Sequence, residues 1–196
     1  MAKIRGYKIN MGSVNKKVAQ SRKYNQEVDL IAKRKFDEAK KQLLEDFDNH
    51  PVTQELKSGP SSTNLSNTLG GYGNLFSYIG FPDGTDPTAI VRAFLIASIK
   101  LKRSSRGGNL NVTYSVSLPS LQDFNFAKMP WEGGNNWVQA VESGISGFSY
   151  YMTKASEASR SGEAIQIDNK IRARGSSAGI DYMTKIINKF RQRLIT

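Results

Sequence analysis

The sequence predicts an α+β fold: a small, mostly antiparallel sheet with a central hairpin, and a long N-terminal helix and a C-terminal helix packed against it. Residues 99–118 alternate apolar and polar side chains on both sides of a Gly-rich turn, as a hairpin with one buried face does. Residues 14–47 lack Gly and Pro and repeat apolar side chains every three or four positions, which is typical of an amphipathic helix. Residues 180–194 repeat this spacing. Strands that pair locally, with helices gathered against them, indicate the α+β class.

Four segments follow one another along the chain. Residues 1–13 are basic and show no sustained period, so we expect an N-terminal arm. Residues 14–57 are expected to form a long basic helix with a short extension. Residues 58–74 are rich in Gly, Ser, Thr and Asn and predict a flexible connection. Residues 75–196 then form the α+β domain.

The elements before the hairpin are predicted from local signals. Pro51 ends the long helix, because the residue before a proline is pushed out of the α region, and His50 is expected as a helix C-cap or surface residue. Residues 75–81 are dense in apolar side chains and predict a short strand. Asp86 as N-cap and Pro87 at the first helical position predict a short helix that leads into the hairpin.

The elements after the hairpin alternate between helix and strand. Residues 120–125 predict a helical turn, and residues 136–144 a short helix. On that helix Trp137 lies near Val138 and Val141, and we expect its indole to fill the core. Residues 145–152 and 163–171 predict two further strands, or a bend entering one in the first case.

Positive charge is concentrated at the two ends of the chain. The 28 Lys and Arg exceed the 17 Asp and Glu, which gives a formal net charge of +11. Residues 1–45 carry 12 basic and 5 acidic side chains and residues 154–196 carry 9 and 4, whereas the stretch between them carries 7 and 8. We therefore expect a negatively charged partner to meet the terminal helices. The longest apolar run is too short to span a bilayer, so no membrane partner is expected.

The sequence offers few residues for catalysis or metal binding. Cysteine is absent and His50 is the single histidine, which excludes thiolate and multi-histidine metal sites. Two carboxylate pairs, Asp46 with Asp48 and Asp83 with Asp86, are close enough to hold a divalent cation, but acidic residues at helix ends more often bind their own backbone. No Gly-rich phosphate-binding run opens a helix. We expect no enzymatic activity, no cofactor and no metal.

Four segments together resemble a known family. They are NLFSYIGF (residues 74–81), PWEGGNNW (130–137), GISGFSYY (144–151) and RSGEAIQIDNK (160–170). Their series resembles tailed-bacteriophage neck proteins, in particular the tail-completion proteins similar to the HK97 gp10 family. The resemblance implies a virion structural protein of the neck, active in tail completion or head–tail joining and assembled in the host cytoplasm. It also implies a homo-oligomeric ring, a hexamer or dodecamer, with other neck, connector and tail proteins as neighbours.

The hairpin turn carries the candidate contact residues. Lys100, Lys102, Arg103 and Arg106 cluster on or beside a turn that a monomer has no evident folding reason to charge so heavily. We expect them to meet an acidic neighbouring subunit or genomic DNA that passes through the ring. The alternative function is that of a basic nucleic-acid-binding protein that uses its cationic terminal helices on phosphates. Aromatic and basic residues are not interleaved on one element, which favours the ring.

Overall fold

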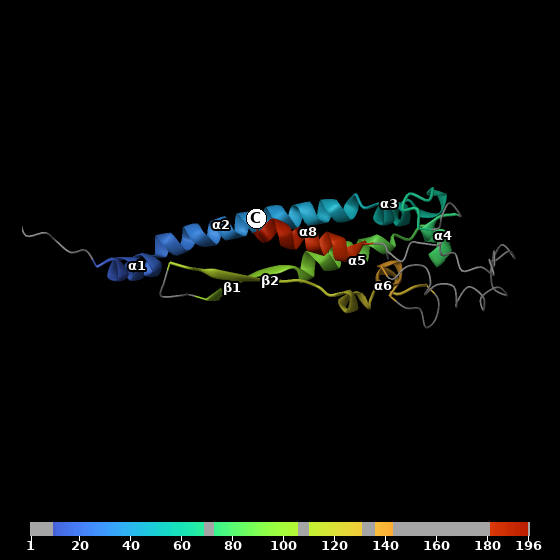
Figure 1. Cartoon of the computed structure of the whole chain (residues 1–196). Helices are drawn as coiled ribbons and strands as arrows, with labels where there is room; N and C mark the ends of the chain where they lie inside the picture. Colours follow the sequence, from blue (N-terminus) through green and yellow to red (C-terminus); the bar gives the residue numbers. More distant parts are fainter. Residues whose placement is uncertain (1–9, 69–72, 106–109, 131–135, 143–180, 196) are drawn as a thin grey trace, which may run out of the picture. The chain divides into compact units, whose positions relative to one another are not determined.

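The computed structural model describes residues 10–68, 73–105, 110–130, 136–142 and 181–195. Its architecture is mixed α+β, with a long N-terminal helix, a two-stranded antiparallel sheet and a C-terminal helix, so the predicted fold class is confirmed (Figure 1). The elements are α1 (Met11–Gln20), α2 (Arg22–Asp48), α3 (Pro51–Lys57), η1 (Gly59–Ser61), α4 (Leu75–Ile79), α5 (Pro87–Ser98), β1 (Lys100–Ser105), β2 (Thr113–Ser117), η2 (Leu121–Phe124), α6 (Trp137–Glu142) and α8 (Met183–Ile195).

The chain divides into two compact units, and the boundary falls within α2 and at the base of the hairpin. Unit 1 comprises Met1–Glu38 and Lys100–Ser117, and unit 2 comprises Ala39–Ile99 and Leu118–Thr196. These units are not the four segments expected from the sequence, whose boundaries stay a prediction.

In unit 1 the hairpin lies along the first part of α2 (Figure 1). The antiparallel register pairs Leu101 with Val116 and Arg103 with Tyr114, and it shifts between Arg103 and Ser105. Partly buried and exposed residues alternate along β2 and along the first four residues of β1. The predicted hairpin is therefore confirmed, with one face turned toward α2 and the other toward water.

The predicted single helix over residues 14–47 is two helices. α1 ends at Gln20, and Ser21 adopts an extended conformation with φ −64° and ψ 129°. The Asn25 side-chain amide donates hydrogen bonds of 2.9 Å to the carbonyl oxygens of both Ala19 and Ser21. Asparagine thereby satisfies backbone carbonyls at the break, an interaction that the spacing of apolar residues does not report.

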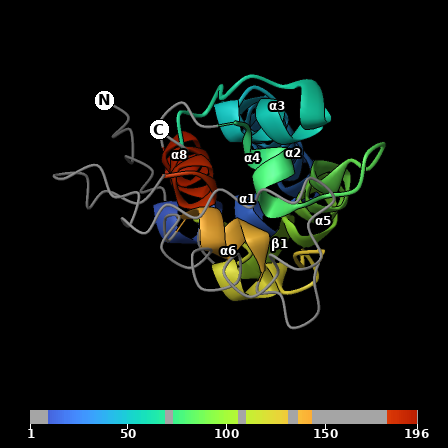
Figure 2. The same ribbon diagram turned by 90° about the vertical axis from the view of Figure 1, so that its right-hand side faces the viewer.

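Unit 2 holds most of the apolar core. Within it α3 contacts both α4 and α5, and Figure 2 shows the three helices gathered together. Trp137 is 1 % exposed, which confirms its predicted place in the core. The other buried apolar side chains among the described residues of unit 2 are Ala39, Leu43, Phe47, Val52, Leu56, Leu75, Phe76, Ile79, Val91, Leu95, Ile99, Phe124, Ala127, Met129, Val138, Val141, Tyr182, Met183, Ile186, Ile187 and Phe190.

Residues 75–81 do not form the predicted strand, because this segment is the short helix α4 followed by a turn. The Asn74 side-chain oxygen accepts a 2.8 Å hydrogen bond from the Ser77 N–H, which caps the helix at its start. Gly80 ends the helix in the left-handed region, at φ 84°. Leu75, Phe76 and Ile79 are buried, a helical spacing that the dense apolar run concealed.

The remaining local predictions have mixed outcomes. Asp86 caps α5 as expected, since its carboxylate accepts the Thr88 N–H at 2.9 Å. The predicted helices at 120–125 and 136–144 correspond to η2 and α6. His50 is the N-cap of α3 and not the C-cap of the helix before it. The strands expected at 145–152 and 163–171 lie outside the described residues.

Candidate functional site

Asp29 of α2 organises the polar contacts between α2 and the hairpin in unit 1. Its carboxylate accepts two hydrogen bonds of 3.0 Å from the Arg103 guanidinium and a third from the Tyr114 hydroxyl. Arg103 also donates to the side-chain oxygen of Asn25. Tyr24 donates a 2.5 Å hydrogen bond to the carbonyl of Leu110, which precedes β2. Partial burial, then the hydrogen bond to the Asp29 carboxylate, raises the pKa of Tyr114.

These contacts separate the four predicted site residues. Arg103 is bound to Asp29, so the premise that a monomer has no folding reason for charge on the hairpin is wrong at this position. Lys100 and Lys102 lie on the exposed face of β1, and neither forms an ion pair with another described residue. Arg106 lies outside the described residues. Lys100 and Lys102 therefore stay the available contact residues of the hairpin.

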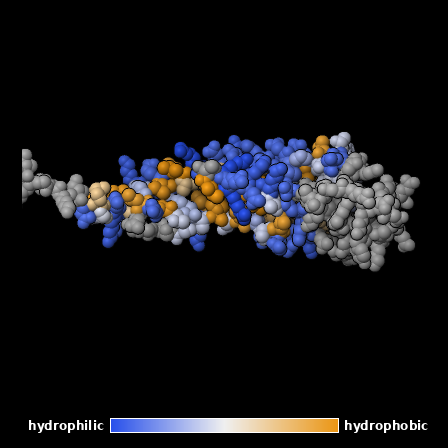
Figure 3. Space-filling view, in the orientation of Figure 1, coloured by the Kyte–Doolittle hydropathy of each residue, from blue (hydrophilic) through white to orange (hydrophobic). Residues whose placement is uncertain are grey.

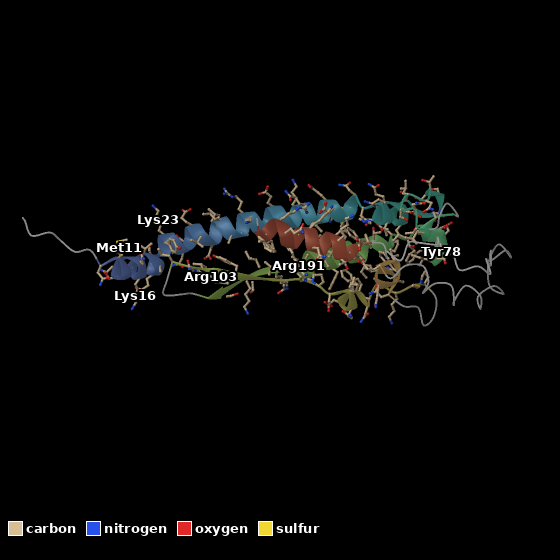
Figure 4. The ribbon with its side chains drawn as sticks, viewed as in Figure 1. Met11, Lys16, Lys23, Tyr78, Arg103 and Arg191 are labelled. Carbon is tan, nitrogen blue, oxygen red and sulfur yellow. The ribbon has the colours of Figure 1, made fainter. Side chains whose placement is uncertain are left out.

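The net positive charge of the chain belongs almost entirely to unit 1. Unit 1 contains 14 basic and 4 acidic side chains, a formal net charge of +10, whereas unit 2 contains 14 and 13. Lys16 and Lys23 project from α1 and α2 (Figure 4), and the first acidic residue of the chain is Glu27. Unit 1 is therefore strongly cationic, and unit 2 is close to neutral.

Large apolar side chains are exposed on the helices of unit 1. Leu30 and Ile31 of α2 are 63 % and 56 % exposed, and α1 buries no residue at all. Figure 3 shows apolar residues at the surface over α1 and the first turns of α2. Leu30 and Ile31 do not belong to the apolar stripe that predicted the helix. Two large apolar side chains outside that stripe are a signal in the sequence for a second apolar surface.

Three of the four carboxylates considered for cation sites, Asp46, Asp48 and Asp86, bind other groups of the chain. Asp46 lies 2.6 Å from the Arg193 guanidinium and 3.8 Å from the Lys189 amine. Asp48 lies 2.9 Å from Arg92, and this hydrogen bond raises the pKa of the guanidinium further. Within the described ranges no group of three or more His, Cys, Asp and Glu is placed to hold a metal ion. Asp46 and Asp48 hold the helices of unit 2 to one another.

The single histidine has a structural contact on each side. Its Nδ1 accepts the Val52 N–H at 3.3 Å, and its ring lies 4.7 Å from the Tyr182 ring. Burial lowers the pKa of His50, and two nearby lysines, Lys185 and Lys189, lower it further. Tyr182 is itself buried and shares a 2.7 Å hydrogen bond with the Thr53 hydroxyl. His50 is thus used in capping and packing.

Glu55 is a fully buried carboxylate that sequence reasoning missed. One oxygen accepts the Leu75 N–H at 2.5 Å and the other accepts the Ser66 N–H at 2.7 Å. The two hydrogen bonds attach the start of α4 and the preceding loop to α3. Burial of this polar group is tolerated because backbone N–H groups bind both of its oxygens.

Comparisons with known proteins identify no relative of this chain. No family model, no curated protein and no solved structure matches the chain. None of the helices in the described part of the chain is long and apolar enough to cross a membrane. The function is therefore argued from the residues themselves.

Proposed function

We propose that this protein is a structural subunit of the neck of a tailed-bacteriophage virion, in which copies of the chain form a ring at the head–tail junction. One observation carries the proposal: the helices of unit 1 leave large apolar side chains uncovered, with α1 burying none of its residues and Leu30 and Ile31 of α2 mostly exposed. Neighbouring apolar side chains at a surface are typical of protein–protein contacts. The chain thus has surfaces that a neighbouring subunit would complete.

The hairpin supports the same conclusion. Among the described residues the sheet contains only β1 and β2, so each strand has one edge that no described strand pairs. A two-stranded sheet is marginally stable by itself, and open edges accept strands from neighbouring molecules. A ring provides such a neighbour for every copy.

The sequence resemblance supplies the biological setting for the ring. The series of four segments along this chain resembles that of phage neck proteins. One of them, residues 74–81, includes α4 and its C-terminal turn in unit 2. The internal partners of Asp46, Asp48 and His50 favour a structural role over a catalytic one.

The mass of the assembled protein tests the ring. Native mass spectrometry and negative-stain microscopy of the purified full-length chain should give a closed ring, a hexamer or a dodecamer. A monodisperse monomer, both at high concentration and in the presence of phage head and tail fractions, would contradict the proposal.

A nucleic-acid-binding protein is the second candidate, and the charge of unit 1 favours it. Fourteen basic against four acidic side chains in unit 1 would attract phosphates. A salt titration of duplex DNA binding distinguishes the two candidates. Tight binding by a monomer, with a steep dependence on salt, would support the second candidate and count against the ring.

Lys100 and Lys102 provide a test of the hairpin contact. The double change Lys100→Glu with Lys102→Glu should leave the thermal midpoint unchanged, because both side chains are exposed. If the hairpin meets an acidic subunit, heads and tails should no longer join. If it meets DNA, joining should persist and DNA retention should fail. Lys57→Glu on the exposed side of α3 is the matched control, and fully infectious double-variant particles would refute a contact role for the hairpin.

A further inference from the structure

The outer side of α2 in unit 1 carries an exposed apolar pair between charges of both signs. Leu30 and Ile31 are 63 % and 56 % exposed. Four exposed charged side chains lie on the same side of the helix, at spacings of three, four and seven residues from one another and from the apolar pair. We call this surface the α2 outer face; its residues are Lys23, Glu27, Leu30, Ile31, Arg34 and Glu38.

The α2 outer face is turned away from the hairpin. Asn25 and Asp29 bind Arg103 of β1, and Phe36 is buried, so these positions mark the inner side of the helix. With about 3.6 residues per turn, the α2 outer face is centred on the opposite side. Figure 4 shows Lys23 projecting from α2 on the side away from β1. This surface is therefore open to a partner.

The four charged side chains of the α2 outer face have no ion-pair partner among the described residues. Lys23 and Glu27 are four residues apart, as are Arg34 and Glu38, a spacing at which ion pairs form along a helix. A pair of this kind does form near the end of α2, at 3.7 Å. Neither pair of the α2 outer face is formed, so all four charges remain available.

The order of these charges is complementary to itself in reverse. Glu27 and Arg34 lie equally far from the midpoint of the apolar pair, on either side of it. Lys23 and Glu38 do the same farther out. Two copies of α2 that cross at this midpoint in opposite directions would therefore place every carboxylate against a cation. In a parallel pair each charge would meet its own kind, which is repulsive.

The net charge of unit 1 favours the same orientation. Seven basic residues precede Glu27, the first acidic residue of the chain, so positive charge gathers before and at the start of α2. In the antiparallel pair the starts of the two α2 helices are about 25 Å apart along the helices, whereas salt screens exposed charges over about 8–10 Å. Parallel helices would bring the two cationic starts together.

We propose that the α2 outer face binds the same face of a second copy, with the two helices antiparallel and the contact centred between Leu30 and Ile31. This contact goes beyond the proposed ring, because identical patches join only two copies, whereas a ring closes through contacts between different patches. In a hexamer or a dodecamer it would join the copies in pairs. A nucleic acid fits this surface less well, because Glu27 and Glu38 would repel its phosphates.

Engineered cysteines test the orientation, since the full-length chain has none of its own. Glu27→Cys mixed with Arg34→Cys should form a disulfide between two copies on mild oxidation, because facing positions of packed helices lie within the roughly 7 Å between Cα atoms that a disulfide spans. Either variant alone should stay unlinked, because equivalent positions are about 10 Å apart along antiparallel helices. Glu27→Cys mixed with Lys33→Cys, an exposed position of α2 outside the face, is the matched control.

Charge reversal tests the pairing of opposite charges. Glu27→Arg should weaken association in sedimentation velocity by about tenfold, because the symmetric contact replaces two ion pairs with two like-charge contacts. Combining it with Arg34→Glu should restore association, since both signs are then exchanged. Lys33→Glu should leave association unchanged. All three positions are exposed, so the thermal midpoint should stay at the wild-type value.

The outcomes separate this contact from the proposed ring. A mixture that forms no disulfide, in a chain that still assembles as a ring, would overturn the α2 contact and leave the proposed function standing. A disulfide in Glu27→Cys alone would overturn the antiparallel orientation. Linked pairs that never exceed two copies would support the α2 contact and contradict the ring, whereas a monomeric wild-type chain would overturn both.

Discussion

Replacing Trp137 with alanine should destabilise the protein by about 3–5 kcal/mol, the usual cost of truncating a buried aromatic side chain. The Trp137 ring lies 6.3 Å from that of Phe81 in an edge-on arrangement and 6.4 Å from that of Tyr182 in a stacked one. Aromatic pairs contribute about 0.5–1.5 kcal/mol each beyond burial. The loss of both contacts therefore places the expected effect in the upper half of the range, at about 4–5 kcal/mol.

Thermal unfolding followed by circular dichroism measures this effect. For a chain of this size each kcal/mol lowers the midpoint by about 2–4 °C, so Trp137→Ala should lower it by about 8–20 °C. Trp137→Phe keeps an aromatic ring and should lose less. Gln139→Ala, an exposed change on the same helix, should stay within about 2 °C of wild type. A Trp137→Ala midpoint equal to that of the control would refute the reasoning, because the indole would then add nothing to the core.

Three further changes concern buried or paired polar groups. Asp29→Asn should weaken the hairpin by only about 1 kcal/mol, since the ion pair is partly exposed. It should also lower the pKa of Tyr114 toward its ordinary value, and an unchanged pH titration of the Tyr114 ring resonances in NMR would contradict this. The folded-state pKa of His50 is lowered by burial, then by two nearby lysines, so the unfolded chain binds the proton more strongly. The unfolding free energy should therefore fall as the pH drops below 6.5. The fall should be smaller in His50→Asn, which keeps a side-chain oxygen to cap the helix. Urea midpoints that do not change with pH in either protein would contradict this contribution of His50. Glu55→Gln leaves one backbone N–H without its acceptor, which should destabilise the protein by about 1–3 kcal/mol. Hydrogen exchange should become faster at the released amide, which is that of Leu75 or that of Ser66. Unaltered exchange at both amides would count against the role of Glu55 as a buried acceptor.

The sequence by itself determined the elements whose signals lie within a few residues of one another. The alternation through residues 99–118 predicted the hairpin because side chains on a strand point to opposite faces in turn. Asp86 and Pro87 predicted the start of α5 because an N-cap acts on the next two or three N–H groups. Asn74 and Gly80 carried equally local signals for α4, but the dense apolar run between them was interpreted as a strand.

Only the tertiary structure decided how the polar groups are used. Arg103 has the same charge as Lys100 and Lys102, yet it alone lies on the face of β1 that meets α2, where Asp29, 74 residues earlier, binds it. Glu55 likewise finds its N–H partners 11 and 20 residues away, after the intervening loop has folded back. An ion pair or hydrogen bond depends on the distance between two atoms, and a one-dimensional pattern reports the face on which a side chain lies but not the group that it meets there.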